Sequence, residues 1–465
     1  MIAIPRSLAR TYRTVLRRCL SPPGARPEPP LVLARSDGQS LTLQACGPDV
    51  AVRHAAALAG PAGALAFRAT VLAQVEGKTD AEATLEEVTA SRGRATWADG
   101  GVPRTAEFDA ADPAALPELP QVPARLAPVP EGLLVALGEA SRVAARESAR
   151  FATGRVQLRG KAGQVVATDG RQLLIQGGFH LPWADDVLVP RLPLLDLPGV
   201  SPTDPAGLAR AGDHLILRVG AWSFWLALDA TGRFPTAEDA IPRERGGSRL
   251  RLDPRDAALL VATLPKLPGR DDEFAPVTLD LGTPPAVRAR SAKGGFAAEV
   301  VLARSESSGA PVRVATDRRY LLRAAQLGLA EIQVVRPDVP LVAREAGKVL
   351  VWMPLDAGAV VPPGKDVQRL PSAEDVPPPL PEPSTQRRRT IMPAPSGNGH
   401  PPDDRSPPER GGFAELIAEA EALRQQLAEA SIRSARLVAA LKQHKRQARA
   451  VAAAVVSLRQ LDLGG

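Results

Sequence analysis

The chain has 465 residues, of which 44% are hydrophobic and 3% aromatic, and it carries a formal net charge of +7 with a pI near 9.8. This length is enough for about two to four domains with cores built mainly from Leu, Val and Ala, and the basic charge is compatible with a polyanionic partner without identifying one. Two cysteines, Cys19 and Cys46, are too few for a disulfide framework and favour a cytoplasmic protein, and no apolar run reaches the length of a membrane span.

A basic amphipathic helix is expected at the start of the chain, over residues 6–20. At 100° per residue, one stripe of this helix holds four arginines, namely Arg6, Arg10, Arg13 and Arg17. The apolar face roughly opposite holds Leu8, Tyr12, Val15, Leu16 and Cys19. A cationic helix of this kind suits an import receptor, an anionic membrane or a nucleic acid, and the helix alone does not decide among them.

An approximate internal repeat of about 115–125 residues runs through the first 358 residues. Each unit begins with a helix, and these helices are expected over 6–20, 131–148 and 254–266. A pair of strands with alternating apolar and polar residues follows in each unit. Three copies of this helix and strand pattern predict an α+β fold with domains at 1–125, 126–245 and 246–358.

The second half of each unit is expected to hold a short helix and further strands. The short helices are expected in "FRATVLAQVEG", "VPRLPLLDLPG" and "TDRRYLLRAAQLG". The closing strands, each with a proline, are expected at "ALPELP", "GRFPTAEDAIP" and "VWMPLD".

A Pro-rich segment and a long helix are expected after the repeats. Residues 359–412 have almost no apolar periodicity and are interpreted as a disordered or extended linker. Residues 413–461 show apolar positions spaced alternately four and three apart, which predicts a weak coiled coil. An acidic first half and a basic second half favour an antiparallel helical partner, whose identity the sequence does not give. A solvated single helix and a contact of the basic half with DNA remain alternatives.

Five segments occur in order and in register with the repeat: "GARPEPPLVLA" at 24–34, "VATDGRQLLIQ" at 166–176, "GRFPTAEDAIP" at 232–242, "APVRVATDRRYLLRAAQLG" at 310–328 and "VLVWMPLD" at 349–356. Together they resemble the bacterial sliding clamp, the beta subunit of DNA polymerase III. Each segment alone is weak evidence, and the resemblance covers about residues 1–356. It implies a homodimeric ring with sheets outside and helices lining a hole for duplex DNA.

The resemblance also implies a role for the N-terminal arginines. Arg6, Arg10, Arg13 and Arg17 are expected to contact DNA phosphates, together with the loop residue Arg26. Seven further arginines lie on other segments expected to line the hole, namely Arg68, Arg142, Arg146, Arg191, Arg318, Arg319 and Arg323. The import and membrane interpretations weaken, because the helix belongs to the first domain and its apolar face is needed for the core.

A second expected site is a cleft between the second and third domains, where the family binds short peptides of DNA polymerase and the clamp loader. By motif, its wall includes Arg150, Thr168, Gly170, Leu173, Pro235, Val339, Val351, Met353 and Pro354. The chain departs from the family at Arg171, Asp239, Ala240 and Asp356, which adds acid to the cleft and puts the usual peptides in doubt. The C-terminal Gln460–Leu463 resembles the family's partner peptides without their aromatic residue, and its own cleft is a hypothetical target.

The sequence contains no recognisable catalytic, metal or cofactor motif, so no cofactor and no enzymatic activity are expected. The favoured function is that of a processivity factor that encircles duplex DNA and tethers a polymerase during replication or repair. The alternative is a divergent clamp-fold scaffold that recruits partners through its coiled-coil tail rather than serving the main replicase.

Overall fold

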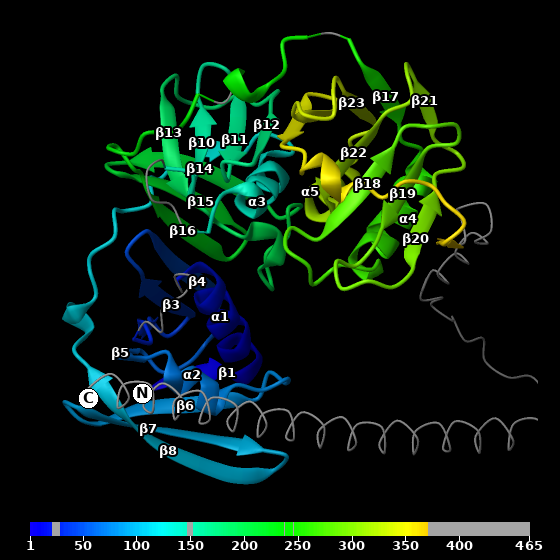
Figure 1. Cartoon of the computed structure of the whole chain (residues 1–465). Helices are drawn as coiled ribbons and strands as arrows, with labels where there is room; N and C mark the ends of the chain where they lie inside the picture. Colours follow the sequence, from blue (N-terminus) through cyan, green and yellow to red (C-terminus); the bar gives the residue numbers. More distant parts are fainter. Residues whose placement is uncertain (21–27, 147–151, 237, 245, 371–465) are drawn as a thin grey trace, which may run out of the picture. The chain divides into compact units, whose positions relative to one another are not determined.

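The computed structural model describes residues 1–20, 28–146, 152–236, 238–244 and 246–370 (Figure 1). They belong to one compact unit, Met1–Leu380, and a second unit, Pro381–Gly465, lies outside the described residues. The coiled coil expected at 413–461, its partner, and the Gln460–Leu463 segment therefore stay predictions. Within the described ranges, no helix is long and apolar enough to cross a membrane.

The first repeat has a strand, a helix and three strands, followed by the same order again. Its elements are β1 (Ile2–Pro5), α1 (Arg6–Cys19), β2 (Leu31–Ser36), β3 (Ser40–Cys46), β4 (Val50–Ala57), β5 (Gly63–Arg68), α2 (Thr70–Val75), β6 (Glu82–Thr89), β7 (Arg92–Asp99) and β8 (Val102–Ala111), with a short 3-10 turn, η1 (Pro113–Ala115), after them. Strands β2 and β3 alternate buried and partly exposed residues along part of their length, because one face of the sheet covers the core.

The second repeat keeps this order with a shorter second helical element. Its elements are β9 (Ala127–Pro128), α3 (Leu133–Val143), β10 (Arg155–Arg159), β11 (Gln164–Thr168), β12 (Gln172–Gln176), β13 (Asp186–Pro190), η2 (Leu194–Asp196), β14 (Ala206–Ala211), β15 (His214–Val219) and β16 (Trp222–Ala227), followed by η3 (Glu238–Ala240). The helix expected in 189–199 is only the 3-10 turn η2, because Pro190, Pro193 and Pro198 remove backbone donors there.

The third repeat adds one edge strand, β21. Its elements are β17 (Ser248–Arg251), α4 (Pro254–Thr263), η4 (Leu264–Lys266), β18 (Pro276–Asp280), β19 (Ala286–Ala289), β20 (Ala297–Val301), β21 (Glu306–Ser308), β22 (Arg313–Asp317), α5 (Arg318–Gln326), β23 (Glu331–Val334), β24 (Leu341–Glu345) and β25 (Lys348–Trp352). Two further elements follow, η5 (Ala357–Ala359) and β26 (Val367–Leu370).

Two sequence expectations are wrong in this part of the chain. Strands do not form at "ALPELP" or at "GRFPTAEDAIP", since the closing strands of the first two repeats end at Ala111 and Ala227 and the prolines that follow cannot donate to a sheet. The linker expected from residue 359 does not start there, because β26 belongs to a sheet. A four-residue strand is too short to show a periodic pattern in the sequence.

Every repeat contributes two four-stranded groups to the sheets. The group around the first helix is ordered β5-β2-β3-β4, β13-β10-β11-β12 and β22-β18-β19-β20 in the three repeats. The other group combines the strand before the first helix with the three strands after the second helical element. Its order is β1-β6-β7-β8 in the first repeat, β9-β14-β15-β16 in the second and β17-β23-β24-β25 in the third. The last strand of each group therefore occupies an edge that can pair with another repeat.

Neighbouring repeats join through these edge strands. Strand β4 pairs antiparallel with β16, from Val50↔Leu226 to His54↔Trp222. Strand β12 pairs antiparallel with β25 in the equivalent way, from Gln172↔Trp352 to Gln176↔Lys348. The rule is thus that the last strand of a first group pairs with the last strand of the next repeat's second group.

Side chains reinforce the first junction. The ring of Tyr12 from α1 stacks on Trp222 of β16 with 5.9 Å between centroids, and the Tyr12 hydroxyl donates to the Val52 carbonyl at 3.1 Å. His54 of β4 meets the edge of Trp222 at 4.5 Å, and among the described residues its buried Nδ1 has no hydrogen-bond partner. Burial lowers the pKa of His54 to about 4, so the imidazole is neutral in the folded protein at neutral pH.

The first testable prediction concerns His54 and acid. Because the unfolded imidazole takes up a proton near pH 6.5 and the folded one only near pH 4, His54 lowers the free energy of unfolding progressively as the pH falls through this window. The loss between about pH 7 and about pH 5 is at most roughly 2 kcal/mol. His54→Phe should keep the contact with Trp222 and reduce this acid sensitivity in urea unfolding, whereas His180→Phe at an exposed position should not. Equal acid sensitivity of His54→Phe and the unaltered protein would contradict the assignment.

Candidate nucleic-acid and peptide interfaces

Helix α1 presents its apolar residues to the core and part of its basic stripe to solvent. Ala9, Tyr12, Val15 and Leu16 are buried, while Arg10, Arg17 and Arg18 are exposed. Arg17 and Arg18 lie in the last turn, where positive charge complements the helix dipole. Within the described residues neither Arg10 nor Arg17 forms an ion pair, so both guanidinium groups face water.

Arg6 does not belong to the exposed stripe, which corrects the sequence expectation. Its side chain is buried, and its Nε donates to the Val75 carbonyl at 3.0 Å. Its two terminal nitrogens donate to the Ala98 carbonyl at 2.6 Å and to the Asp99 carboxylate at 2.9 Å. The helical projection places Arg6 on the stripe but cannot show that α2 ends beside it. The guanidinium therefore caps the C-terminus of α2 and is unavailable to DNA.

The same kind of cap occurs in the other two repeats. Arg318, the first residue of α5, is buried and donates to the carbonyls of Leu264 at 3.1 Å and Leu267 at 2.7 Å, just after α4. Its Nε donates to the Ala275 carbonyl before β18 at 2.9 Å. Arg191 donates from Nε to the Ser141 carbonyl of α3 at 2.9 Å. Two arginines expected to line the hole thus satisfy backbone carbonyls instead. Arg68 also leaves its expected helix, because it ends strand β5 and donates to the Pro29 carbonyl.

The remaining predicted DNA-binding residues have different surroundings. Arg13 is partly exposed and holds both carboxylate oxygens of Glu76 at 2.9 Å, so its charge is already compensated. Arg26 lies outside the described residues. Arg10 and Arg17 are therefore the two predicted residues that present uncompensated positive charge on the described surface.

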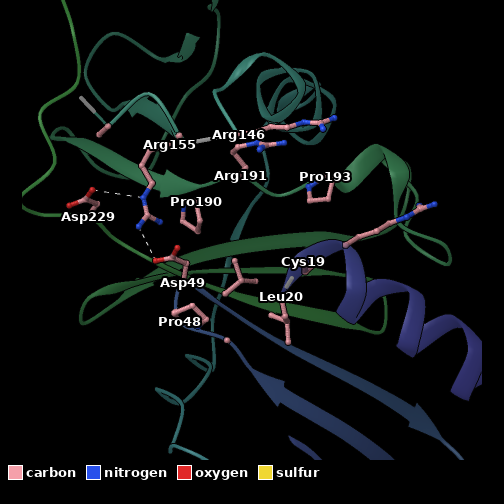
Figure 2. A pocket seen from close by; sticks show the side chains of 15 residues that line it. Cys19, Leu20, Pro48, Asp49, Arg146, Arg155, Pro190, Arg191, Pro193 and Asp229 are labelled. Carbon is pink, nitrogen blue, oxygen red and sulfur yellow. Dashed lines mark hydrogen bonds and ion pairs between the residues drawn. The ribbon is translucent and has the colours of Figure 1, made fainter. Parts of the chain in front are cut away.

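A cationic pocket lies where the end of α1 meets the second repeat (Figure 2). Its volume is about 630 Å³, and its basic lining comprises Arg18, Arg146, Arg155 and Arg191. Burial and the neighbouring charge of Arg146 lower the pKa of Arg191, which means that an anion in this pocket would relieve electrostatic repulsion. The pocket joins residues that are distant in the chain, so no local pattern in the sequence reveals it.

Arg155 holds the wall of this pocket together. Figure 2 shows it between Asp49 and Asp229, whose carboxylates lie 2.8 Å and 3.8 Å from its nitrogens. Burial raises the pKa of Asp229, but hydrogen bonds from the backbone of Gly232 and Thr231 outweigh it and hold the pKa below its ordinary value. Asp229 therefore stays ionised at neutral pH, and the contact of Arg155 with Asp49 ties the β3–β4 turn to the second repeat.

The expected peptide cleft lies near the hairpin between β11 and β12. The Thr168 hydroxyl donates to the Gln172 carbonyl at 2.7 Å and accepts from the Gly170 backbone at 3.0 Å. Gly170 has φ of 88°, a conformation that favours glycine. Asp169 accepts from the backbone of Arg171 and Gln172, which is a turn role rather than a catalytic one.

An apolar cluster separate from the main core lies on the opposite face of the sheet that contains this hairpin. Leu173 and Val351 are paired across β12 and β25 and pack with Val166, Ile175 and Val342. Phe234 and Ile241, which are partly buried, pack against them from the loop after β16. Leu173 and Val351 are the two members that the motif resemblance predicts. Alternation along the strands is the signal that indicates the other members, which the motifs do not include.

The other predicted cleft residues are only partly connected to this cluster. Met353 is 47% exposed, and its backbone donates to the Arg171 carbonyl at 3.0 Å, at the end of the same hairpin. Pro235 and Pro354 adjoin Phe234 and Met353 in the chain and are partly buried. Val339 is partly buried in the turn after β23, and no contact with the cluster is established for it. Arg150 lies outside the described residues.

Comparison with solved structures places this fold among bacterial sliding clamps. The DNA polymerase III subunit beta of Pseudomonas aeruginosa matches with a TM-score of 0.59 at 19% identity, over 76% of this chain and 99% of that chain. A putative DNA polymerase III beta subunit from Eubacterium rectale (TM-score 0.60, 13% identity) and the Helicobacter pylori beta clamp bound to a DNA ligase peptide (0.59, 14%) match over the same shares. No protein-family model matches the sequence, and no curated protein matches it.

The chain therefore has the sliding-clamp fold, as its sequence motifs predicted. The likeness covers nearly the whole of each solved clamp and about three quarters of this chain, at low sequence identity.

The second prediction separates the structural from the surface arginines of α1. Arg6→Met should lower the free energy of unfolding by about 2–4 kcal/mol, because carbonyls at the end of α2 and Asp99 lose a charged donor. Arg10→Met on the same helix should change it by no more than about 0.5 kcal/mol. Urea unfolding of the two variants beside the unaltered protein measures both effects. Equal free energies of unfolding for the two variants would contradict the structural role of Arg6.

Proposed function

We propose that this protein is a DNA sliding clamp that forms a head-to-tail homodimeric ring around duplex DNA and tethers a polymerase. The observation that carries the proposal is the pairing rule between repeats. The rule is satisfied twice within one chain, by the pairs β4–β16 and β12–β25. By the same rule β20 of the third repeat should pair with β8 of a first repeat, but these two strands are not paired within the chain. Two chains can satisfy the rule at both remaining junctions, which closes a ring.

The electrostatics of the described surface favour a polyanion inside such a ring. Arg10 and Arg17 are exposed on α1, and the cationic pocket with Arg18, Arg146 and Arg191 lies at the end of the same helix. Contacts of arginine with phosphates do not depend on base sequence and therefore permit sliding. We propose an accessory protein without catalysis or cofactor. In the described residues, no group of three or more His, Cys, Asp and Glu side chains could hold a metal ion.

The third prediction tests whether the ring encloses DNA. A linear duplex carrying biotin at both ends is incubated with the full chain at high concentration, so that rings thread over the ends, and streptavidin then blocks both ends. A topological link predicts retention in high salt until a restriction enzyme cuts the duplex, because only an end releases a ring. Arg10→Gln/Arg17→Gln should shift threading to lower salt while leaving retention of threaded protein intact.

Duplex with open ends is the control for this experiment. Duplex left without streptavidin should lose the protein in high salt, since its ends are open. Protein that washes off blocked and open duplex alike would refute the enclosed ring, and the scaffold alternative would then be the better account of the fold.

We further propose that the apolar cluster around Leu173 and Val351 binds short peptides of a DNA polymerase or clamp loader. The partly buried Phe234 and Ile241, which pack on the cluster, and the exposed Met353 at the end of the same hairpin give a peptide apolar surface near Thr168 and Gly170. The Helicobacter pylori structure that shares this fold is described as bound to a DNA ligase peptide, which supports a peptide site on the fold.

The fourth prediction tests this cleft. A fluorescent peptide ending in Gln-Leu-Asp-Leu-Phe should bind the full chain, and Met353→Asp should weaken it about tenfold or more, because a charge replaces an exposed apolar contact. Val88→Asp, which alters a similarly exposed apolar residue on β6, should leave peptide affinity unchanged. Fluorescence polarisation gives both values. Identical weakening by the two variants would show that the peptide binds elsewhere.

A further inference from the structure

The outer edge of β20 is occupied by a strand from the segment that follows the third repeat. Strand β26 pairs with it in parallel, with Ala297↔Val367, Ala298↔Gln368, Glu299↔Arg369 and Val300↔Leu370 as partners. The sheet order β22-β18-β19-β20-β26 makes β26 the terminal strand. Neither of the other two repeats has a strand from its own segment at this position, because β4 and β12 pair there with the next repeat.

The segment reaches β20 by crossing the sheet of the third repeat. The backbone of Leu355 donates to the Ala315 carbonyl of β22 at 2.8 Å, and η5 then packs on β18 and β22. The Val361 backbone donates to the hydroxyl of Thr278 on β18 at 2.7 Å. We call residues 355–370 the strap, because they run from one edge of this sheet to the other and end on β20.

Strand β8 carries the complementary unsatisfied edge. It pairs with β7 from Val102↔Asp99 to Asp109↔Arg92, whereas β5 meets it only at Ala110 and Ala111. Within the described residues, the other side of β8 between 102 and 109 has no strand beside it. A row of free backbone donors and acceptors of this kind is a template for another strand.

We propose that the strap is an internal competitor for ring closure: β26 occupies the edge of β20 that β8 of a second copy needs. This inference rests on the proposed function, since it takes the ring junction from the pairing rule between repeats. The backbone groups on that edge of β20 can pair with β26 or with β8 of the partner, but not with both. The protein therefore closes its ring only when β26 leaves β20.

Several features make β26 a displaceable occupant. It forms four residue pairs, in the parallel arrangement that is slightly less stable per residue, and Gln368 and Arg369 are exposed. Phe296, directly before β20, remains 58% exposed beside the strap, and Val102 at the start of β8 is 53% exposed. An antiparallel β8 offers up to eight residues and can cover such apolar side chains, so a second copy can replace the strap.

The fifth prediction compares two double variants of the full chain. Gln368→Pro/Arg369→Pro removes two backbone donors of β26 and disfavours the strand, whereas Gln368→Ala/Arg369→Ala keeps the backbone and changes only exposed side chains. Sedimentation equilibrium measures dimer formation. The proline variant should have a dimer dissociation constant at least about tenfold lower than the alanine variant, equivalent to about 1.4 kcal/mol.

A reversible lock tests the same idea in the opposite direction. Glu299 and Arg369 are direct partners across β20 and β26, so Glu299→Cys/Arg369→Cys can join the strap to the edge by a disulfide. The oxidised variant should remain monomeric at concentrations where Glu299→Cys alone dimerises, and a reductant should restore its dimer. A locked protein that dimerises as well as its reduced form would overturn the proposal.

The outcomes separate this inference from the proposed ring. If the proline and alanine variants both dimerise with equal affinity, the ring stands and the strap is not a competitor. If the proline variant dimerises more weakly, β26 belongs to the dimer interface and the proposal is wrong. If neither variant dimerises at any concentration, both the strap as competitor and the homodimeric ring are refuted.

Discussion

Backbone pairing between edge strands of successive repeats is the constraint on which the rest of the structure depends. Each of the two strand groups in a repeat ends in an edge strand. Unpaired backbone N–H and C=O groups on such an edge lower stability if they are buried, and they pair with other strands if they are exposed. The pairs β4–β16 and β12–β25 satisfy two of these edges and make continuous sheets out of separate repeats. The contact of α1 with Trp222 and the cationic pocket lie at the first junction. The apolar cluster of Leu173 and Val351 lies at the second junction, where β12 pairs with β25.

Arginine serves two purposes in this fold, and the groups around each side chain decide between them. Arg6, Arg191 and Arg318 donate to carbonyls at the ends of α2, α3 and α4 with its extension η4, where a helix leaves backbone acceptors without partners. Arg10 and Arg17 lie on the water-facing side of α1 and keep their charge free. The guanidinium group suits both tasks because it presents several donors in a plane and is always charged. A basic composition is therefore a poor measure of the charge available to a polyanion.

The cationic pocket and the strap share one feature, which is that both lie at junctions. The pocket joins the end of α1 to the second repeat through Arg155 and its two carboxylates. The strap covers the edge of β20, which corresponds to the edges of β4 and β12 that pair with the next repeat. An interaction at either place alters how repeats or subunits join, without disturbing the core of any repeat.

The sequence by itself determined the repeat, the α+β class, the sliding-clamp resemblance and the amphipathic character of α1, because these depend on local periodicity and on motifs in a fixed order. The motif resemblance also named Leu173 and Val351, which the structure brings together in one apolar cluster. The sequence could not determine that Arg6 is buried or that β26 exists. Only the tertiary structure decided these, because each depends on a neighbour far away in the chain: the end of α2 for Arg6, and the free edge of β20 for a four-residue strand.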